Sequence, residues 1–135
     1  MASTFNLEIL TPYRSFFKGE VEMLILPGSD GEYGILASHS PMVTAINPGK
    51  LRIKQNNEWK EASVSTGFIE VLPESSILLC DTCEWPHEID ANRAKIAKEK
   101  AEEVLRQNIS QIEHIKAQAA LRRALSRLKV VKKLN

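Results

Sequence analysis

The sequence contains no run of about 18 apolar residues, the length that a helix needs to cross a membrane. Its N-terminus, Met-Ala-Ser-Thr-Phe-Asn, lacks both the basic and the apolar segment of a secretory signal peptide. We therefore expect the chain to reside in the cytoplasm and to cross no bilayer by itself.

Cysteine is scarce, because Cys80 and Cys83 are the only two and together form one CxxC motif. A structural zinc site needs four ligands, and no second pair supplies the other two. A redox motif usually has its first cysteine at a helix N-terminus, whereas this pair ends a strand-like segment. We expect reduced thiols and no metal site. A small redox protein that uses this pair is an alternative that replacing either cysteine would test.

Motifs for nucleotide hydrolysis and for nucleophilic catalysis are also missing. The pattern GxxxxGK[ST] does not occur, and the glycine-rich segment 28–34 carries Asp30 and Glu32 but no lysine. Its glycines therefore indicate turns. The three histidines, at positions 39, 87 and 114, are scattered and form no evident catalytic group with Ser, Asp or Cys. The sequence predicts no catalytic residue, and any nucleotide bound would be a ligand.

The first part of the chain alternates apolar and polar residues with the period of a β-strand. Phe5, Leu7 and Ile9 alternate with Asn6 and Glu8. Similar segments occupy residues 21–25, 51–55, 59–65, 67–72 and 76–82, and they are separated by Pro, Gly and Asn pairs typical of turns. Short strands at this spacing, without helical crossovers, predict an antiparallel sandwich or barrel.

The second part has no aromatic residue, glycine or proline after Pro86, and its composition favours helix. Two segments carry apolar stripes at helical spacing: Ala94, Ala97, Ala101, Val104 and Leu105 in the first, and Ala117, Ala120, Leu121, Ala124, Leu125 and Leu128 in the second. Ser110 and Glu113 form a capping-box pattern between them. We expect an antiparallel helical hairpin whose alanine-rich seam buries little apolar area and is only marginally stable.

Charge divides the chain at the same boundary. Residues 1–86 contain 6 Lys/Arg and 11 Asp/Glu, whereas residues 87–135 contain 12 Lys/Arg and 6 Asp/Glu. From His114 onward there are seven basic residues and no acid: Lys116, Arg122, Arg123, Arg127, Lys129, Lys132 and Lys133. This asymmetry predicts two units with different partners, the second of which attracts something anionic.

Asp90 and Arg93 stand where the strand-like pattern gives way to the helical one. Asp90 as an N-cap, with Arg93 solvated, is one interpretation. The other is an anion site, because an antiparallel hairpin would bring Arg93 and Lys100 near Arg123 and Arg127 at a helix N-terminus. Four convergent cations would suit a polyphosphate, and Asp90 would then orient Arg93 or accept a hydrogen bond from a ribose or a base.

The basic final helix has three interpretations. Its charges can simply face water. It can bind nucleic acid, although no aromatic residue is available for stacking and the first half of the chain is acidic. It can also dock on an acidic protein surface, since an apolar stripe flanked by Arg and Lys fits an apolar groove with an acidic rim.

Four motifs in order resemble the ε subunit of F-type ATP synthases over essentially the whole chain. They are GEYGILASHSP (residues 31–41), TGFIEV (66–71), EIDANRAK (88–95) and ALRRALSRLKV (120–130). Ser38 stands where members of that family often have Gly, and Thr66 replaces the first Gly of a Gly-Gly pair.

The resemblance implies a β + α fold: an antiparallel β-sandwich over residues 1–86 and a two-helix antiparallel hairpin over residues 87–135. It implies a non-catalytic rotor subunit on the cytoplasmic face of the membrane, held there only through the complex. The partners would be the γ subunit, the c-ring and the α and β subunits, and none would be nucleic acid. Glu32 and His39 match positions at the γ and c-ring interface.

The hairpin would alternate between a folded state on the sandwich and an extended state that inhibits ATP hydrolysis. Arg122, Arg123, Arg127 and Lys129 would make the inhibitory contact with the α and β subunits. ATP, with or without Mg²⁺, would be a regulatory ligand that favours the folded state. Its implied contacts are Glu84, Ile89, Asp90, Arg93, Ala94, Lys100, Arg123 and Arg127, and Lys100 takes the place of a family arginine.

Overall fold

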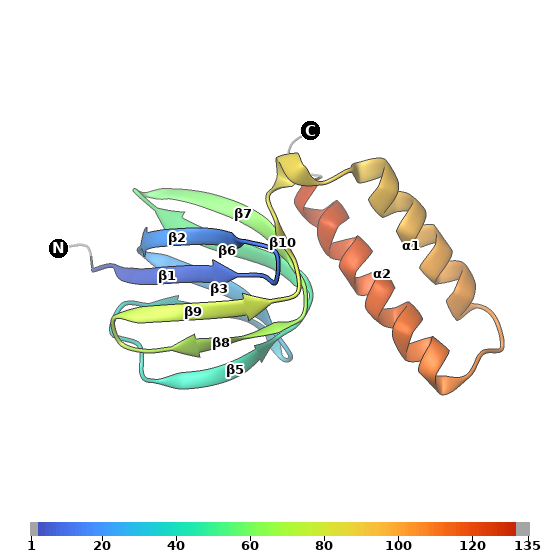
Figure 1. Cartoon of the computed structure of the whole chain (residues 1–135), viewed down its shortest axis with the longest axis horizontal. Coiled ribbons are helices and arrows are strands. Elements are labelled where there is room, and N and C mark those ends of the chain that lie inside the picture. Colours follow the sequence, from blue (N-terminus) through green and yellow to red (C-terminus); the bar gives the residue numbers. More distant parts are fainter. Residues whose placement is uncertain (1–2, 132–135) are drawn as a thin grey trace.

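The computed structural model describes residues 3–131, and Lys132 and Lys133 of the basic run lie outside them. Two sheets form a sandwich, and a two-helix hairpin lies at one end of it (Figure 1). Sheet A has the strand order β2-β1-β9-β8-β5, and sheet B has the order β10-β7-β6-β3-β4. The strands are β1 Phe5–Leu10, β2 Ser15–Val21, β3 Met23–Gly28, β4 Gly31–Leu36, β5 Met42–Ile46, β6 Gly49–Gln55, β7 Glu58–Val64, β8 Gly67–Val71, β9 Ser75–Cys80 and β10 Cys83–Glu84. These elements confirm the β-sandwich followed by a helical hairpin.

The alternating apolar residues face the space between the sheets. Phe5, Leu7 and Ile9 of β1 are buried, as are Leu51 and Ile53 of β6. The main hydrophobic core is drawn entirely from residues of the sandwich. The period of two therefore identified the buried face of β1 and β6, because successive side chains of a strand point to opposite faces of the sheet. The alternation of Val21, Met23 and Ile25 indicated the wrong face of β3, since Leu24 and Leu26 are the buried residues there.

One strand pair departs from the antiparallel pattern. β1 and β9 run parallel, with Asn6 opposite Ser75 and Leu10 opposite Leu79, while the other strand pairs are antiparallel. Alternation could not predict this direction, because a half-buried strand has the same period in either orientation.

Several turn residues have the left-handed backbone that their positions require. Asn56 and Asn57, with φ of 52° and 63°, join β6 to β7, as expected for a two-residue hairpin turn. Ser38 has φ of 64°, a conformation that glycine adopts without steric cost. The frequent Gly of the ε family at this position therefore has a conformational reason. At Gly67, a Cβ would collide with the carbonyl oxygen of Leu79, so this position requires Gly.

The chain leaves β10 through a 3₁₀ turn, Pro86–Glu88, and forms α1, Ala91–Leu105, and α2, Gln111–Val131. Both predicted starts are confirmed. Asp90 caps α1 by accepting a hydrogen bond from the backbone N–H of Arg93, at 3.1 Å. Ser110 caps α2 by accepting from the N–H of Glu113, and its hydroxyl donates to the Glu113 carboxylate. No helix within residues 3–131 has both the length and the apolar character to cross a membrane.

The seam between the helices is built from small side chains, as expected. Its buried members are Ala94, Ala101, Ala117 and Ala124. Leu125, which the stripe included, is instead 43% exposed. The stripe was too wide on this side because α2 packs against two neighbours, α1 and the sandwich, and Leu125 faces neither of them fully.

A second face of α2 rests on sheet B. Ser126 donates a hydrogen bond to the carbonyl oxygen of Gly49 at 2.7 Å, and its oxygen lies 2.7 Å from the hydroxyl of Ser63. Ser63 and Ser126 are 5% and 4% exposed, and Val130 beside them is also buried. The sequence did not indicate this contact, because serine on a charged helix is usually solvated.

Candidate functional site

A hollow of about 350 Å³ lies where the linker, the start of α1 and the end of α2 meet. This volume falls within the usual range of small-molecule sites. Its lining residues are Glu84, Glu88, Ile89, Asp90, Arg93, Ala94, Ala97 and Arg127. The hollow therefore exists only while α2 is folded against the linker and α1.

Local sequence explains how the linker shapes this hollow. Pro86 begins the 3₁₀ turn, and Ile89 returns to an extended backbone with φ of −92° before Asp90 caps α1. The first turn of α1, with its backbone N–H groups, therefore borders the hollow, where the helix dipole favours an anion. One of them, the N–H of Arg93, is already occupied by the Asp90 carboxylate.

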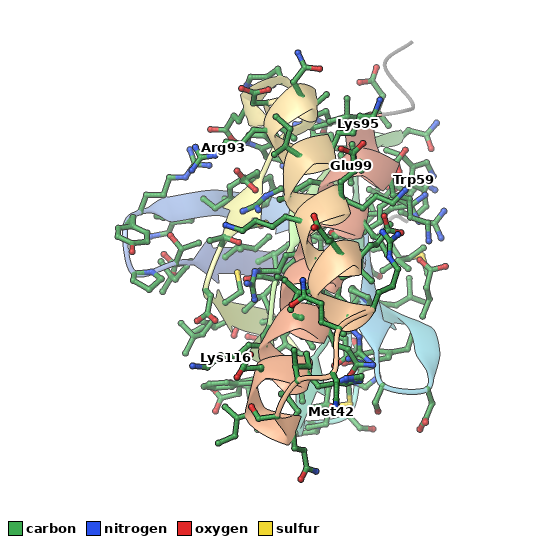
Figure 2. The ribbon with its side chains drawn as sticks, turned by 90° about the vertical axis from the view of Figure 1, so that its right-hand side faces the viewer. Met42, Trp59, Arg93, Lys95, Glu99 and Lys116 are labelled. Atoms are coloured by element: carbon green, nitrogen blue, oxygen red, sulfur yellow. The ribbon has the colours of Figure 1, made fainter. Side chains whose placement is uncertain are left out.

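The two arginines of the hollow differ in their partners. The Nε of Arg127 donates to Glu84 Oε1 at 2.6 Å, and both side chains are about 30% exposed or less. Arg93 has no ion pair within residues 3–131, and its side chain projects to one side from the beginning of α1 (Figure 2). One cation is thus available to an anion, and the other would first have to exchange its carboxylate partner.

Two of the four cations that were expected to converge, Arg93 and Arg127, line the hollow, and the other two do not. Lys100 lines a separate hollow beside Lys116, and Arg123 is exposed and does not line the site. Lys100 is about two helical turns beyond Arg93, a rise of roughly 10 Å, and it does not line the hollow. Arg123 lies one turn before Arg127 and points toward solvent. Six of the eight residues implied as ATP contacts line the hollow, and the role of each remains a prediction.

Glu88, which the sequence did not single out, is fixed by Arg14 in the turn between β1 and β2. The guanidinium donates to both carboxylate oxygens at 2.8 Å and to the carbonyl oxygen of Cys83 at 3.2 Å. Glu88 also accepts from the backbone N–H of Trp85. The hydrogen bonds from Arg14 lower the pKa of Glu88 to about 2, and the same pair raises the pKa of Arg14.

Aromatic packing holds the linker beside this ion pair. Trp85 stacks on Phe16 with ring centroids 4.4 Å apart and meets Phe17 edge-on at 6.4 Å. The Arg14 guanidinium lies over the Phe16 ring at 5.1 Å. One wall of the hollow is therefore anchored to the sandwich, whereas the α2 wall is held mainly by the contacts of Arg127 and Ser126.

The residues implied in subunit contacts lie elsewhere. Glu32 near the start of β4 is exposed, with an oxygen 3.5 Å from Arg52, and His39 follows the end of that strand. Arg122, Arg123 and Lys129 are exposed on α2, while Arg127 turns toward Glu84. The roles of these residues at subunit interfaces stay predictions. Residues 3–131 contain no cluster of three or more His, Cys, Asp or Glu that could hold a metal ion.

Comparison with known proteins gives the same result for both parts of the chain. Residues 4–86 match the family "ATP synthase, Delta/Epsilon chain, beta-sandwich domain", and residues 87–132 match "ATP synthase, Delta/Epsilon chain, long alpha-helix domain". The ATP synthase epsilon chain of Ruminiclostridium cellulolyticum is 50% identical, with 93% of this chain and 94% of the relative covered. That of Caldanaerobacter subterraneus is 51% identical, with 98% and 97% covered.

Solved structures share the fold at much lower identity. A chain in the mitochondrial ATP synthase of Euglena gracilis, solved as OSCP/F1/c-ring, superposes with a TM-score of 0.82 at 21% identity, covering 98% of this chain and 82% of that one. A chain in the central stalk/c-ring structure of Tetrahymena thermophila gives 0.60 at 12% identity, covering 98% and 96%. These structures agree with the fold. The family matches over both parts and the relatives of about 50% identity show that this chain belongs to the ATP synthase delta/epsilon family, among the ε chains.

Proposed function

We propose that this chain is a non-catalytic subunit of the central stalk, and that its folded hairpin binds ATP in the hollow between the linker, α1 and α2. The observation that carries the proposal is the composition of the lining. Arg93 comes from α1, Arg127 from α2, and Glu84 from the last strand of the sandwich. A ligand held by all three would bind the folded arrangement and not an extended one.

Within this site, the two arginines would bind the phosphates and the carboxylates would bind the nucleoside. Arg93 has no competing ion pair in the described chain, and the α1 N-terminus favours negative charge. Arg127 would exchange Glu84 for a phosphate oxygen, which would free Glu84 to accept from a base amine or a ribose hydroxyl. Lys100 and Arg123 would have to reach in from their exposed positions, so we expect weaker contributions from them.

Binding of this kind would regulate the hairpin by linkage. A ligand that binds only the folded form stabilises it by about 2.7 kcal/mol at 100 times its dissociation constant. The contacts that hold α2 to the sandwich are few, centred on Ser126, Val130 and Arg127. ATP would therefore move the balance away from an extended state that inhibits ATP hydrolysis. Mg²⁺ can accompany the nucleotide, and no cofactor is obligatory.

The partners in this proposal are the γ subunit, the c-ring and the α and β subunits. The names of the relatives, and the c-ring assemblies named for the structural neighbours, support this setting. The exposed cations Arg122, Arg123 and Lys129 suit acidic surfaces of α and β. The chain would lie on the cytoplasmic face of the membrane through these contacts, and it would engage no nucleic acid.

Titration calorimetry of the full chain with ATP tests the proposed site. Replacing Asp90→Ala together with Arg93→Ala should weaken binding at least tenfold, because a hydrogen bond to a charged group contributes about 1.5–3 kcal/mol. Arg122→Ala removes an exposed arginine of α2 that does not line the hollow and serves as the control. Equal affinity in the double variant and the control would contradict the proposal, as would turnover of the ATP.

A further inference from the structure

The two cysteines meet at the corner where the chain passes from one sheet to the other. Cys80 is the last residue of β9 in sheet A, and Cys83 is the first residue of β10 in sheet B. Both are free thiols and buried, at 6% and 2% exposure. The short spacing of the motif thus places two buried thiols at the same corner of the core.

The turn between them is held in place by an independent set of hydrogen bonds. The backbone N–H of Thr82 donates to the Ser65 hydroxyl at 2.7 Å, and the Thr82 carbonyl accepts from the Ser65 N–H at 3.0 Å. The N–H of Asp81 donates to the carbonyl of Thr66 at 3.1 Å. The backbone that joins the two cysteines is therefore held by the fold and is not a free loop.

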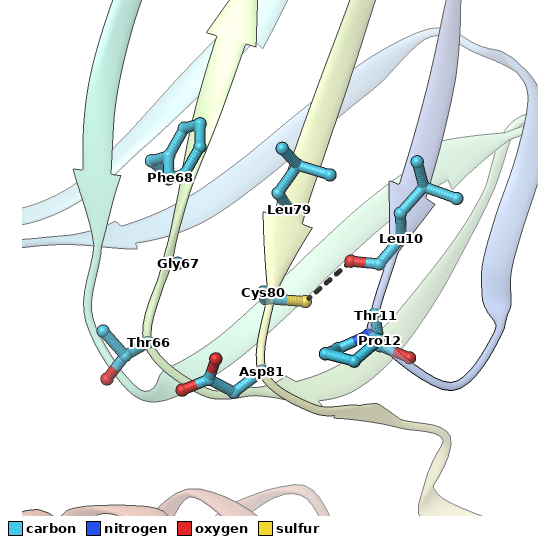
Figure 3. A pocket seen from close by; sticks show the side chains of 9 residues that line it. All are labelled: Leu10, Thr11, Pro12, Thr66, Gly67, Phe68, Leu79, Cys80 and Asp81. Carbon is cyan, nitrogen blue, oxygen red and sulfur yellow. Dashed lines mark hydrogen bonds between the residues drawn. The ribbon is translucent and has the colours of Figure 1, made fainter.

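The two thiols differ in access. Cys80 lines a hollow of about 600 Å³ at the ends of β1, β8 and β9, and its sulfur points toward the carbonyl oxygen of Leu10, 3.9 Å away (Figure 3). Cys83 does not line this hollow. The hydrogen bond donated by Cys83 lowers the pKa of Cys80, while that bond and burial raise the pKa of Cys83. Cys80 is therefore placed to attack a molecule that enters the hollow, and Cys83 is placed to attack the sulfur of Cys80 afterwards, as a resolving thiol does.

We propose that Cys80 and Cys83 are a reversible dithiol–disulfide couple that exchanges with small organic disulfides entering the hollow beside Cys80. The Cys80 thiolate attacks one sulfur of the small disulfide, forms a mixed disulfide and releases one thiolate. Cys83 then attacks the Cys80 sulfur while its proton passes to the departing sulfur; this step forms the internal bond and releases the second half of the small disulfide as a thiol. Two cysteine thiols are oxidised, and one small disulfide is reduced to two thiols.

The proposed disulfide lies next to the contacts that attach the hairpin to the sandwich. Cys83 directly precedes Glu84, the partner of Arg127, and its carbonyl accepts a hydrogen bond from Arg14. The internal disulfide would therefore form one residue away from the contact that joins α2 to the sandwich.

The test uses the full chain, native buffer and bis(2-hydroxyethyl) disulfide as the probe. Intact-mass measurement should show the loss of two hydrogens without an adduct, no thiol left for alkylation after denaturation, and recovery of both thiols with dithiothreitol. Peptide mapping of the wild-type chain should place the bond between residues 80 and 83. A wild-type chain that does not react, or that carries probe adducts without an internal bond, would overturn the proposal whatever the variants do.

Single variants test the assigned order, with circular dichroism confirming that each is folded. Cys83→Ala should accumulate one stable adduct on Cys80, because nothing resolves it. Cys80→Ala should react at least about tenfold more slowly, because the remaining thiol is buried away from the hollow. Equal reaction rates in the two folded variants would contradict the assignment of Cys80 as the attacking thiol.

Discussion

Arg14 and Glu88 show how much a single residue pair contributes to the site without touching a ligand. Arg14 lies on the sandwich and Glu88 on the linker, and their two parallel hydrogen bonds fix one wall of the candidate hollow. They are 74 residues apart in the chain, so no local pattern could pair them. Asp90, by contrast, acts on its own helix, and the spacing of polar and apolar residues was enough to predict its role as a cap.

This ion pair predicts a specific pH dependence of stability. The pKa of Glu88 is lowered to about 2 in the folded chain, from an ordinary value of 4.5. A lowered pKa means that the pair stabilises the fold above about pH 4.5 and that this contribution disappears as the pH falls toward 2. Because the Arg14 side chain is 45% exposed, solvent screening keeps the effect at about 1 kcal/mol or less.

Urea unfolding of the wild type and of Arg14→Gln between pH 6 and pH 2 measures this contribution. The free energies of unfolding should differ most at pH 6 and converge below pH 3. Lys18→Gln removes a charge from the neighbouring strand β2 and controls for a general effect of net charge. A difference that is constant with pH would show that Glu88 is not the titrating group.

At the scale of elements, α2 is the part of the molecule that faces two different neighbours. Alanines on one face pack against α1, and Ser126 and Val130 on another face pack against sheet B. The helical period predicted the first face from apolar residues. The period missed the second face because Ser126, at its centre, is polar. Its burial is favourable only because the fold brings the Gly49 carbonyl within hydrogen-bond distance.

Ser126→Ala should loosen the attachment of α2 to the sandwich. The change leaves the partly buried Gly49 carbonyl and the Ser63 hydroxyl without this partner, which costs about 1–3 kcal/mol. Hydrogen exchange in the second half of α2 should accelerate correspondingly, while exchange in the strands of sheet A should not change. Gln118→Ala, at an exposed position of the same helix, is the control. Equal exchange in both variants would contradict a role for Ser126 in holding the hairpin.

At the scale of the whole molecule, stability is divided unequally between the two parts. The hydrophobic core lies within the sandwich, whereas the hairpin buries mostly alanine. An alanine seam contributes far less than the leucines, isoleucines and valines of the sheets. The sequence was sufficient to predict this division, because composition, period and charge all change near Pro86. The charges indicated an anion site near Arg93 and Arg127, but the sequence did not single out Glu88, which lines the hollow from the linker.

Deleting residues 88–135 should therefore leave a folded sandwich. Trp85 remains and keeps its stacking on Phe16, although the partner of Arg14 is lost. A complex reconstituted with this truncated chain should assemble and should hydrolyse ATP faster than one with the full chain, because the helices that we propose to be inhibitory are absent. Circular dichroism and the rate of ATP hydrolysis provide the two readouts. A truncated chain that folds and assembles without any gain in hydrolysis would contradict inhibition by the hairpin.

Hydrogen exchange of the full chain with and without ATP tests most directly whether a bound anion holds the hairpin closed. At an ATP concentration 100 times the dissociation constant, amides in α1 and α2 that exchange through opening of the hairpin should slow by about 100-fold, since ATP would bind only the closed form. Amides in the core strands should exchange at an unchanged rate. Helices that exchange equally fast with and without saturating ATP would show that the nucleotide does not control the hairpin.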